Sequence, residues 1–186
     1  MNCRRFVSLV VSFATIFVSG LSWAAKSDER LDALFNRLGS ARDGVESRLA
    51  RSAILANLAR AGSDTIELLI ARAAVAEAAG AADVARELLD YVVNLAPEWS
   101  DGYVRRARVR ATAGEDFGAI ADLEAALRIE PRRFDALEML GAVSERAGEK
   151  KQALDAYRRA AAIDRLNEEV RRNAERLRVE VEGRDI

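Results

Sequence analysis

Histidine is absent from this sequence of 186 residues, and Cys3 is its only cysteine. Without imidazole, and with a single thiol, the chain has no catalytic triad, no cysteine–histidine nucleophile and no zinc site of these ligands. We therefore expect a scaffold that is not an enzyme and that needs no cofactor and no metal. A hydrolase that relies on carboxylates is the weakest hypothesis, because pairs such as Glu168 and Glu169 are adjacent on a helix and point apart.

Long apolar runs are also scarce, and the one candidate lies close to the N-terminus. Arg4 and Arg5 precede an apolar run over residues 6–18, and Ser22 and Ala24 are small residues at −3 and −1 for cleavage after Ala24. This is the three-part form of a secretory signal peptide. The run is shorter than the ~20 residues of a membrane span, so an uncleaved anchor in the inner membrane is the alternative. We expect an exported, periplasmic protein of a Gram-negative bacterium.

An excess of positive charge is missing as well. Cleavage after Ala24 would leave residues 25–186, with 27 basic and 30 acidic side chains. Nucleic-acid binding depends on a basic surface, so we expect no nucleic-acid partner. Cys3 would leave with the signal segment, so the mature chain would form no internal disulfide although its compartment is oxidising.

Proline, a residue that interrupts helices, is rare in the chain, and its two positions fit a regular interval. Pro97 and Pro131 are the only two prolines, and the interval between them recurs in Gly80, Gly114 and Gly148. Glycine permits a tight turn between two helices, and proline ends the second helix because it lacks a backbone donor. Small side chains at the same interval would allow two helices to cross closely. The residues that we assign to repeat packing are Ala73, Gly80, Ala85, Pro97, Ala107, Gly114, Ala119, Pro131, Gly141, Gly148, Ala153 and Ala160.

These units resemble the tetratricopeptide repeat (TPR), whose pattern over about 34 residues is W-x2-L-G-x2-Y, then A-x3-F, then P. The third unit is closest to it, with Leu140, Gly141 and Tyr157 at pattern positions, whereas Arg72 and Arg106 replace the leucine in the first two. The resemblance implies an all-α fold, a short right-handed solenoid of helix-turn-helix repeats. It is greatest to the small exported TPR proteins of Gram-negative bacteria.

The spacing also predicts the domain organisation. We expect repeats over residues 66–99, 100–133 and 134–167, followed by a capping helix and tail over residues 168–186. Residues 25–65 read as a helical pair without the repeat pattern. The pair is either an N-terminal cap or a degenerate repeat, and we favour the cap.

The resemblance also implies a binding surface, because in the family the first helix of each repeat lines a concave groove. Transferred position by position, the predicted contact residues are Glu67, Ile70, Ala74, Asp101, Val104, Arg108, Thr112, Asp135, Glu138, Ala142 and Glu145. The lysine and asparagine that hold a C-terminal carboxylate in some members are replaced by Ile70 and Ala74. A helix or extended segment with apolar and some basic character would suit this groove better.

Two structural alternatives apply to these residues: Arg108 would pair with Glu138 on the next first helix, or the superhelix itself would cover Ile70 and Val104. Taken together, the sequence predicts a scaffold or adaptor that binds another protein in the periplasm or envelope. The alternative function is a structural subunit of an envelope assembly complex, anchored by an uncleaved N-terminal segment.

Overall fold

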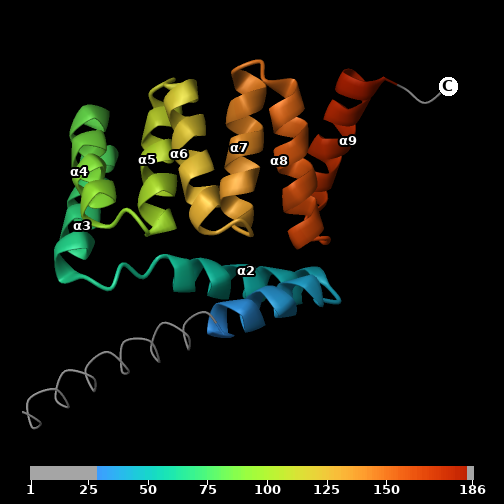
Figure 1. Ribbon diagram of the computed structural model, residues 1–186, viewed down its shortest axis with the longest axis horizontal. Coiled ribbons are helices and arrows are strands. Elements are labelled where there is room, and N and C mark those ends of the chain that lie inside the picture. The colour runs from blue at the N-terminus through green and yellow to red at the C-terminus, as the bar shows by residue number, and fades with distance from the viewer. Residues whose placement is uncertain (1–28, 184–186) are drawn as a thin grey trace, which may run out of the picture.

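The computed structural model describes residues 29–183, which form helices and contain no strand (Figure 1). The predicted signal segment, residues 1–24, lies outside this described part of the chain. A helix over residues 29–39 comes first. The helices that follow are α2 (Gly44–Leu58), α3 (Asp64–Ala78), α4 (Ala82–Leu95), α5 (Ser100–Thr112), α6 (Asp116–Ile129), α7 (Phe134–Arg146), α8 (Lys150–Ile163) and α9 (Glu168–Glu182). The all-α helical-repeat fold that the sequence predicted is confirmed.

Each repeat turns at a glycine in the left-handed region of the backbone. The φ angles are 74° at Gly80, 79° at Gly114 and 85° at Gly148. In the first repeat, the N–H of Gly80 donates to the carbonyl of Glu77 and the N–H of Ala81 donates to the carbonyl of Ala76. This Schellman arrangement satisfies carbonyls at the end of α3, and glycine adopts it without steric cost.

Small residues allow the two helices of a repeat to approach each other. Ala73 and Ala85 are buried between α3 and α4. In the third repeat the helices approach so closely that a Cβ atom on Gly141 would lie 2.6 Å from the ring of Tyr157. The other alanines assigned to packing are buried, namely Ala107, Ala119, Ala153 and Ala160. Pro97 and Pro131 lie exposed in the loops that follow α4 and α6.

The apolar interior is continuous through the second and third repeats and ends under α9. Val170 and Leu177 of α9 are buried in this core, and Ala174 and Val181 pack against it. The first repeat has a smaller core of its own, to which Val109 of α5 contributes. Helix α9 therefore covers the C-terminal end of the solenoid, as a terminal cap does.

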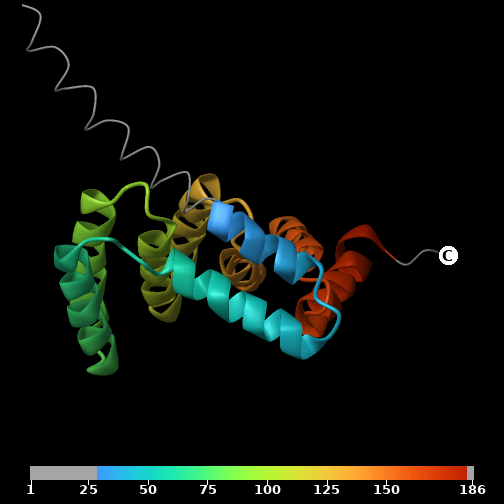
Figure 2. The same ribbon diagram turned by 90° about the horizontal axis from the view of Figure 1, so that it is seen from below.

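The N-terminal helical pair does not lie where an end cap would. Figures 1 and 2 show α2 running across the ends of the repeat helices, beside the loops that join one repeat to the next. Phe35, Leu38, Ala50 and Ile54 of the pair form a small core with Phe134 at the start of α7. The favoured prediction of an N-terminal cap is thus corrected: the pair covers one edge of the solenoid and leaves its first end open.

Polar contacts fix the pair in this position. Ser47 of α2 donates to the buried carboxylate of Asp164 at 3.0 Å, in the loop after α8. At the other end of α2, the indole N–H of Trp99 donates to the carbonyl of Leu58 at 2.9 Å. Both contacts come from loops between the repeats, so they hold the pair along this edge of the solenoid.

Candidate partner-binding surface

The predicted contact residues lie on α3, α5 and α7, but they differ widely in accessibility. Exposed residues are Glu67, Ala74, Arg108, Thr112 and Ala142; half-buried residues are Ile70, Asp135, Glu138 and Glu145; buried residues are Asp101 and Val104. Only part of the predicted groove is therefore available to a partner.

Val104 is a correction to the predicted surface. Its side chain is buried in the core that joins the second and third repeats, where it packs with residues of α6 and α7. The alternative in which the superhelix covers Val104 is the one that the structure supports. Ile70 is half-buried against the first repeat's own core and keeps part of its surface accessible.

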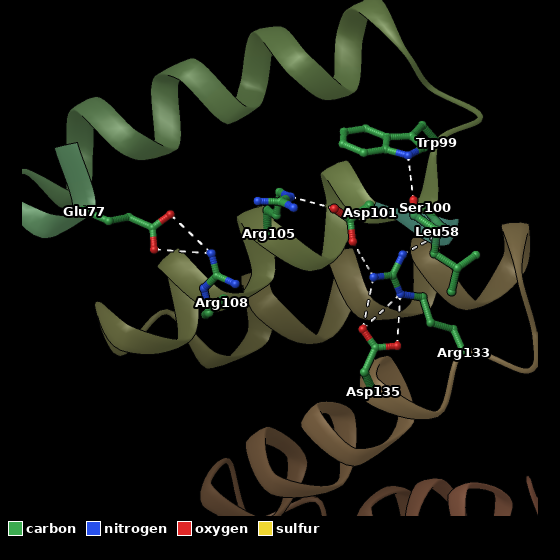
Figure 3. Close-up of polar contacts among 9 residues, drawn as sticks. All are labelled: Leu58, Glu77, Trp99, Ser100, Asp101, Arg105, Arg108, Arg133 and Asp135. Atoms are coloured by element: carbon green, nitrogen blue, oxygen red, sulfur yellow. Dashed lines mark hydrogen bonds and ion pairs between the residues drawn. The ribbon is translucent and has the colours of Figure 1, made fainter. Parts of the chain in front are cut away.

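Asp101 is the second correction, because it is neutralised inside the protein (Figure 3). The guanidinium of Arg133 donates to Asp101, to the hydroxyl of Ser100 at 3.0 Å and to Asp135 at 3.0 Å. Arg105 donates to the other oxygen of Asp101 at 2.6 Å. Burial alone would lower the pKa of Arg133, but the charges of Asp135 and Asp101 outweigh it and raise that pKa. Both carboxylates thus hold the repeats together.

Glu138 is occupied by the N-terminal pair. Arg51 of α2 forms a two-pronged ion pair with Glu138, at 2.8 and 3.0 Å, and also reaches Asp164 at 3.0 Å. Its guanidinium lies 4.2 Å from the centre of the Phe134 ring, within cation–π range. The side-chain amide of Asn167 donates to Glu138 as well, at 2.9 Å. The third repeat therefore offers no free carboxylate at this position.

Arg108 behaves differently from the predicted pair with Glu138. It faces Glu77 on α3, with nitrogen–oxygen distances of 3.4 and 3.5 Å, and half of its side chain is exposed (Figure 3). These distances are longer than those of a well-formed hydrogen bond, so this contact is weak. On α7, Glu145 is held by Arg176 of α9 at 2.7 Å.

Arg51 and Arg133 organise this surface but are not among the residues predicted from the sequence. Arg133 occupies the last position of its repeat, where the first and third repeats have Trp99 and Asn167. All three side chains donate across to another element. A large polar or aromatic residue at this position was the available signal. No sequence signal indicated the role of Arg51, because that role depends on where α2 lies in the folded protein.

Neither a metal centre nor a membrane helix is present in the described part of the chain. No group of three or more candidate ligands among His, Cys, Asp and Glu occurs within residues 29–183. In the same residues, every helix is too short or too polar to cross a bilayer.

Comparisons with known proteins agree with this helical-repeat architecture. No protein-family model matches the chain. A TPR repeat-containing protein of Rhizobium etli is 30% identical over 166 residues, which cover 87% of this chain and 81% of the relative. The crystal structure of MamA matches with a TM-score of 0.60 and 22% identity, over 73% of this chain and 79% of that one. The Yersinia enterocolitica type III secretion chaperone SycD, in complex with a peptide of the translocator YopD, matches with a TM-score of 0.59 and 17% identity, over 63% and 95%.

The architecture is a helical-repeat solenoid, in which paired helices are stacked in a row (Figure 1). The similarity to the Rhizobium etli protein extends over most of both chains. The chain belongs to the tetratricopeptide-repeat family.

Proposed function

We propose that the protein is a non-enzymatic scaffold in the bacterial periplasm or envelope that binds a segment of another protein. The binding surface is the α3–α5 concave surface, which we define as Glu67, Ile70, Ala74, Glu77, Arg108 and Thr112. The main support for this proposal is that these side chains are exposed or half-buried. In contrast, Asp101, Asp135 and Glu138 form ion pairs within the protein. The same fold holds a translocator peptide in the SycD complex, which supports a peptide as the bound element.

The chemistry of this surface indicates the kind of segment that fits. Ile70 and Ala74 provide a small apolar strip between two acids, Glu67 and Glu77. Arg108 is the only basic residue of this surface, and its 3.4 Å contact with Glu77 is long for an ion pair. A basic residue of a partner could therefore replace Arg108 as the partner of Glu77. A helix or extended strand with apolar residues and one or more basic side chains complements this arrangement.

A charge reversal tests the surface without changing the core. We expect Glu67→Lys combined with Ala74→Arg to abolish capture of the partner in a crosslinked pull-down from envelope fractions. Both positions are exposed, so helicity by circular dichroism should stay unchanged. The matched control is Glu169→Lys, which also reverses an acid in the first turn of a helix, on α9. It should leave capture intact, since it changes the helix-dipole energy in the same direction but lies on α9, at the other end of the solenoid.

If the charge-reversal variant captures the same set of partners as the control, the interface lies on the convex face or the terminal helices instead. That result would favour the structural-subunit alternative. The location is tested separately by the intact mass of the exported chain. A start at Ala25 supports a cleaved signal peptide, and a mass that retains residues 1–24 supports the inner-membrane anchor.

A further inference from the structure

The repeat register shows which face of each first helix meets the preceding repeat. Gly102 of α5 is buried, and a Cβ atom there would lie 3.2 Å from Val92 of the first repeat. Its equivalent in the third repeat, Ala136, is also buried. Val109, further along the same face, packs into the core of the first repeat, and its equivalent Val143 is buried. These two positions therefore belong to the contact between successive repeats.

In the first repeat the same two positions are open. Leu68 and Val75 stand one repeat before Gly102 and Val109, and their side chains are 54% and 70% exposed. No helix of the described chain covers them, because the N-terminal pair lies along the edge of the solenoid instead of on this end (Figure 2).

Helix α4 extends the same apolar end. Val84, Tyr91 and Leu95 are 51%, 53% and 60% exposed, and Leu88 between them is half-buried. The third-repeat equivalent of Val84 is Gln152, whose amide donates to Glu124 of the preceding repeat at 2.8 Å. Val84 therefore points out of the first end of the stack. These positions on α4 follow the i, i+4, i+7, i+11 spacing of a helix–helix seam.

The opposite end of the solenoid does not complement this surface. The outer side of α9 is charged, with exposed Glu168 and Arg172 paired at 3.2 Å and a second pair between Glu175 and Arg178. An apolar end that docked on it would remove these ion pairs from water, and the desolvation of both charges in a pair is costly. A head-to-tail chain of copies is therefore disfavoured.

We propose that a second copy of this chain covers the open end, which we define as Leu68, Val75, Val84, Tyr91 and Leu95. Contiguous exposed apolar surface of this kind marks an interaction site. The open end matches itself in an isologous, two-fold arrangement, which is the commonest closed symmetry of soluble oligomers. Each copy supplies what the preceding repeat supplies within the chain, a helix pair with an apolar face.

Two charges determine how the copies are oriented. Arg72 lies between Leu68 and Val75 on one face of α3, and Glu87 lies between Val84 and Tyr91 on α4. Both are exposed, and neither forms an ion pair within residues 29–183. A two-fold arrangement with α3 of one copy against α4 of the other pairs Arg72 with Glu87 twice. Placing α3 against α3 would put like charges together, which is unfavourable.

The dimer would carry two α3–α5 concave surfaces. A partner with two binding segments, or one that is itself dimeric, would then be held by both, and the second contact would form at a high effective concentration.

The mass in solution, measured by light scattering or sedimentation of the purified chain over a range of concentrations, tests the proposal. We expect the native chain to reach a dimer and no larger species. Val75→Glu should raise the dissociation constant by about tenfold or more, because it places a charge in the centre of the contact. The matched control is Phe117→Glu on α6, where the side chain is equally exposed at 70% but lies away from the open end. It should leave the dimer intact.

A charge swap tests the orientation independently of apolar burial. Arg72→Glu alone and Glu87→Arg alone should each weaken the dimer, and the double variant should restore it. A monomer at all concentrations would overturn the proposal and leave the open end to another segment or protein. Polymers that grow with concentration, or a dimer that Val75→Glu does not weaken, would overturn it as well. Failure of the double variant to restore the dimer would overturn the pairing of α3 with α4.

Discussion

Arg133 and Asp101 form an ion pair inside the protein, between the loop before α7 and the first turn of α5. Both side chains are almost fully buried, and Ser100 and Asp135 complete the hydrogen bonds of the guanidinium. A buried charge that loses its partner is strongly destabilising, because the remaining charge has been removed from water without compensation.

Replacement of Arg133 by alanine should therefore lower the free energy of unfolding by about 3–5 kcal/mol. Asp101 keeps Arg105 as a partner, which places the effect toward the lower end of that range. Chemical denaturation followed by circular dichroism measures it. Arg128→Ala, an exposed arginine on α6, is the control and should change stability by less than about 0.5 kcal/mol. Equal losses in the two variants would show that the buried pair contributes nothing specific.

Gly141 makes a second prediction, which concerns packing alone. An alanine at this position places a Cβ atom 2.6 Å from the buried ring of Tyr157, and the ring has little room to move. Gly141→Ala should cost about 1–3 kcal/mol, as overpacking does in other cores. The comparison is Gly118→Ala, also within a helix, where the nearest atom is the Cδ of Arg110 at 3.2 Å, a longer distance than that to the Tyr157 ring. There alanine should be neutral or stabilising because of its helix propensity. A smaller residue at position 157 should reduce the cost of Gly141→Ala in a double-mutant cycle.

How far the sequence could predict this structure depended on the repeat period. The period fixed the helix pairs and their turns, because Gly80, Gly114 and Gly148 recur where each chain reversal needs positive φ. Family positions alone could not distinguish Val104 from Ala74, since both are on the groove side of a first helix. Their burial depends on how closely α5, α6 and α7 approach one another.

The position of α2 could not be predicted from the sequence, for a different reason. The N-terminal pair has no repeat pattern, and its site is formed by Phe134, Asp164 and Trp99, which come from three different loops or helix starts. Its contacts exist only once the repeats have stacked. A prediction that places the pair on the end of the first repeat cannot reveal that this end is open.

Tyr157 gives a prediction for alkaline pH. Burial, and next the negative charge of Glu145, raise the pKa of its phenol above the ordinary value of 10.0. The folded state therefore holds this proton more tightly than the unfolded state does. Its contribution is fully present below pH 10 and is lost as the pH rises from there through the raised pKa. Tyr157→Phe should flatten the fall of the free energy of unfolding above pH 10 relative to the native chain. Parallel curves for the two proteins above that pH would contradict the assignment.

Arg51 tests whether α2 is held by its charges. The guanidinium joins Glu138 of α7 and Asp164 of the loop after α8, and it also lies over the ring of Phe134. Arg51→Ala leaves the buried carboxylate of Asp164 with Ser47 as its side-chain partner, at a cost of about 1–3 kcal/mol. We expect this cost to appear locally, as amide hydrogen exchange in α2 that is faster by about tenfold or more while α7 and α8 keep their protection. Arg48→Ala removes an exposed arginine from the same helix and should leave exchange unchanged. Should protection fall equally in α2 and in the repeats, the pair and the solenoid would unfold as one unit, and α2 would be an integral part of the repeat core.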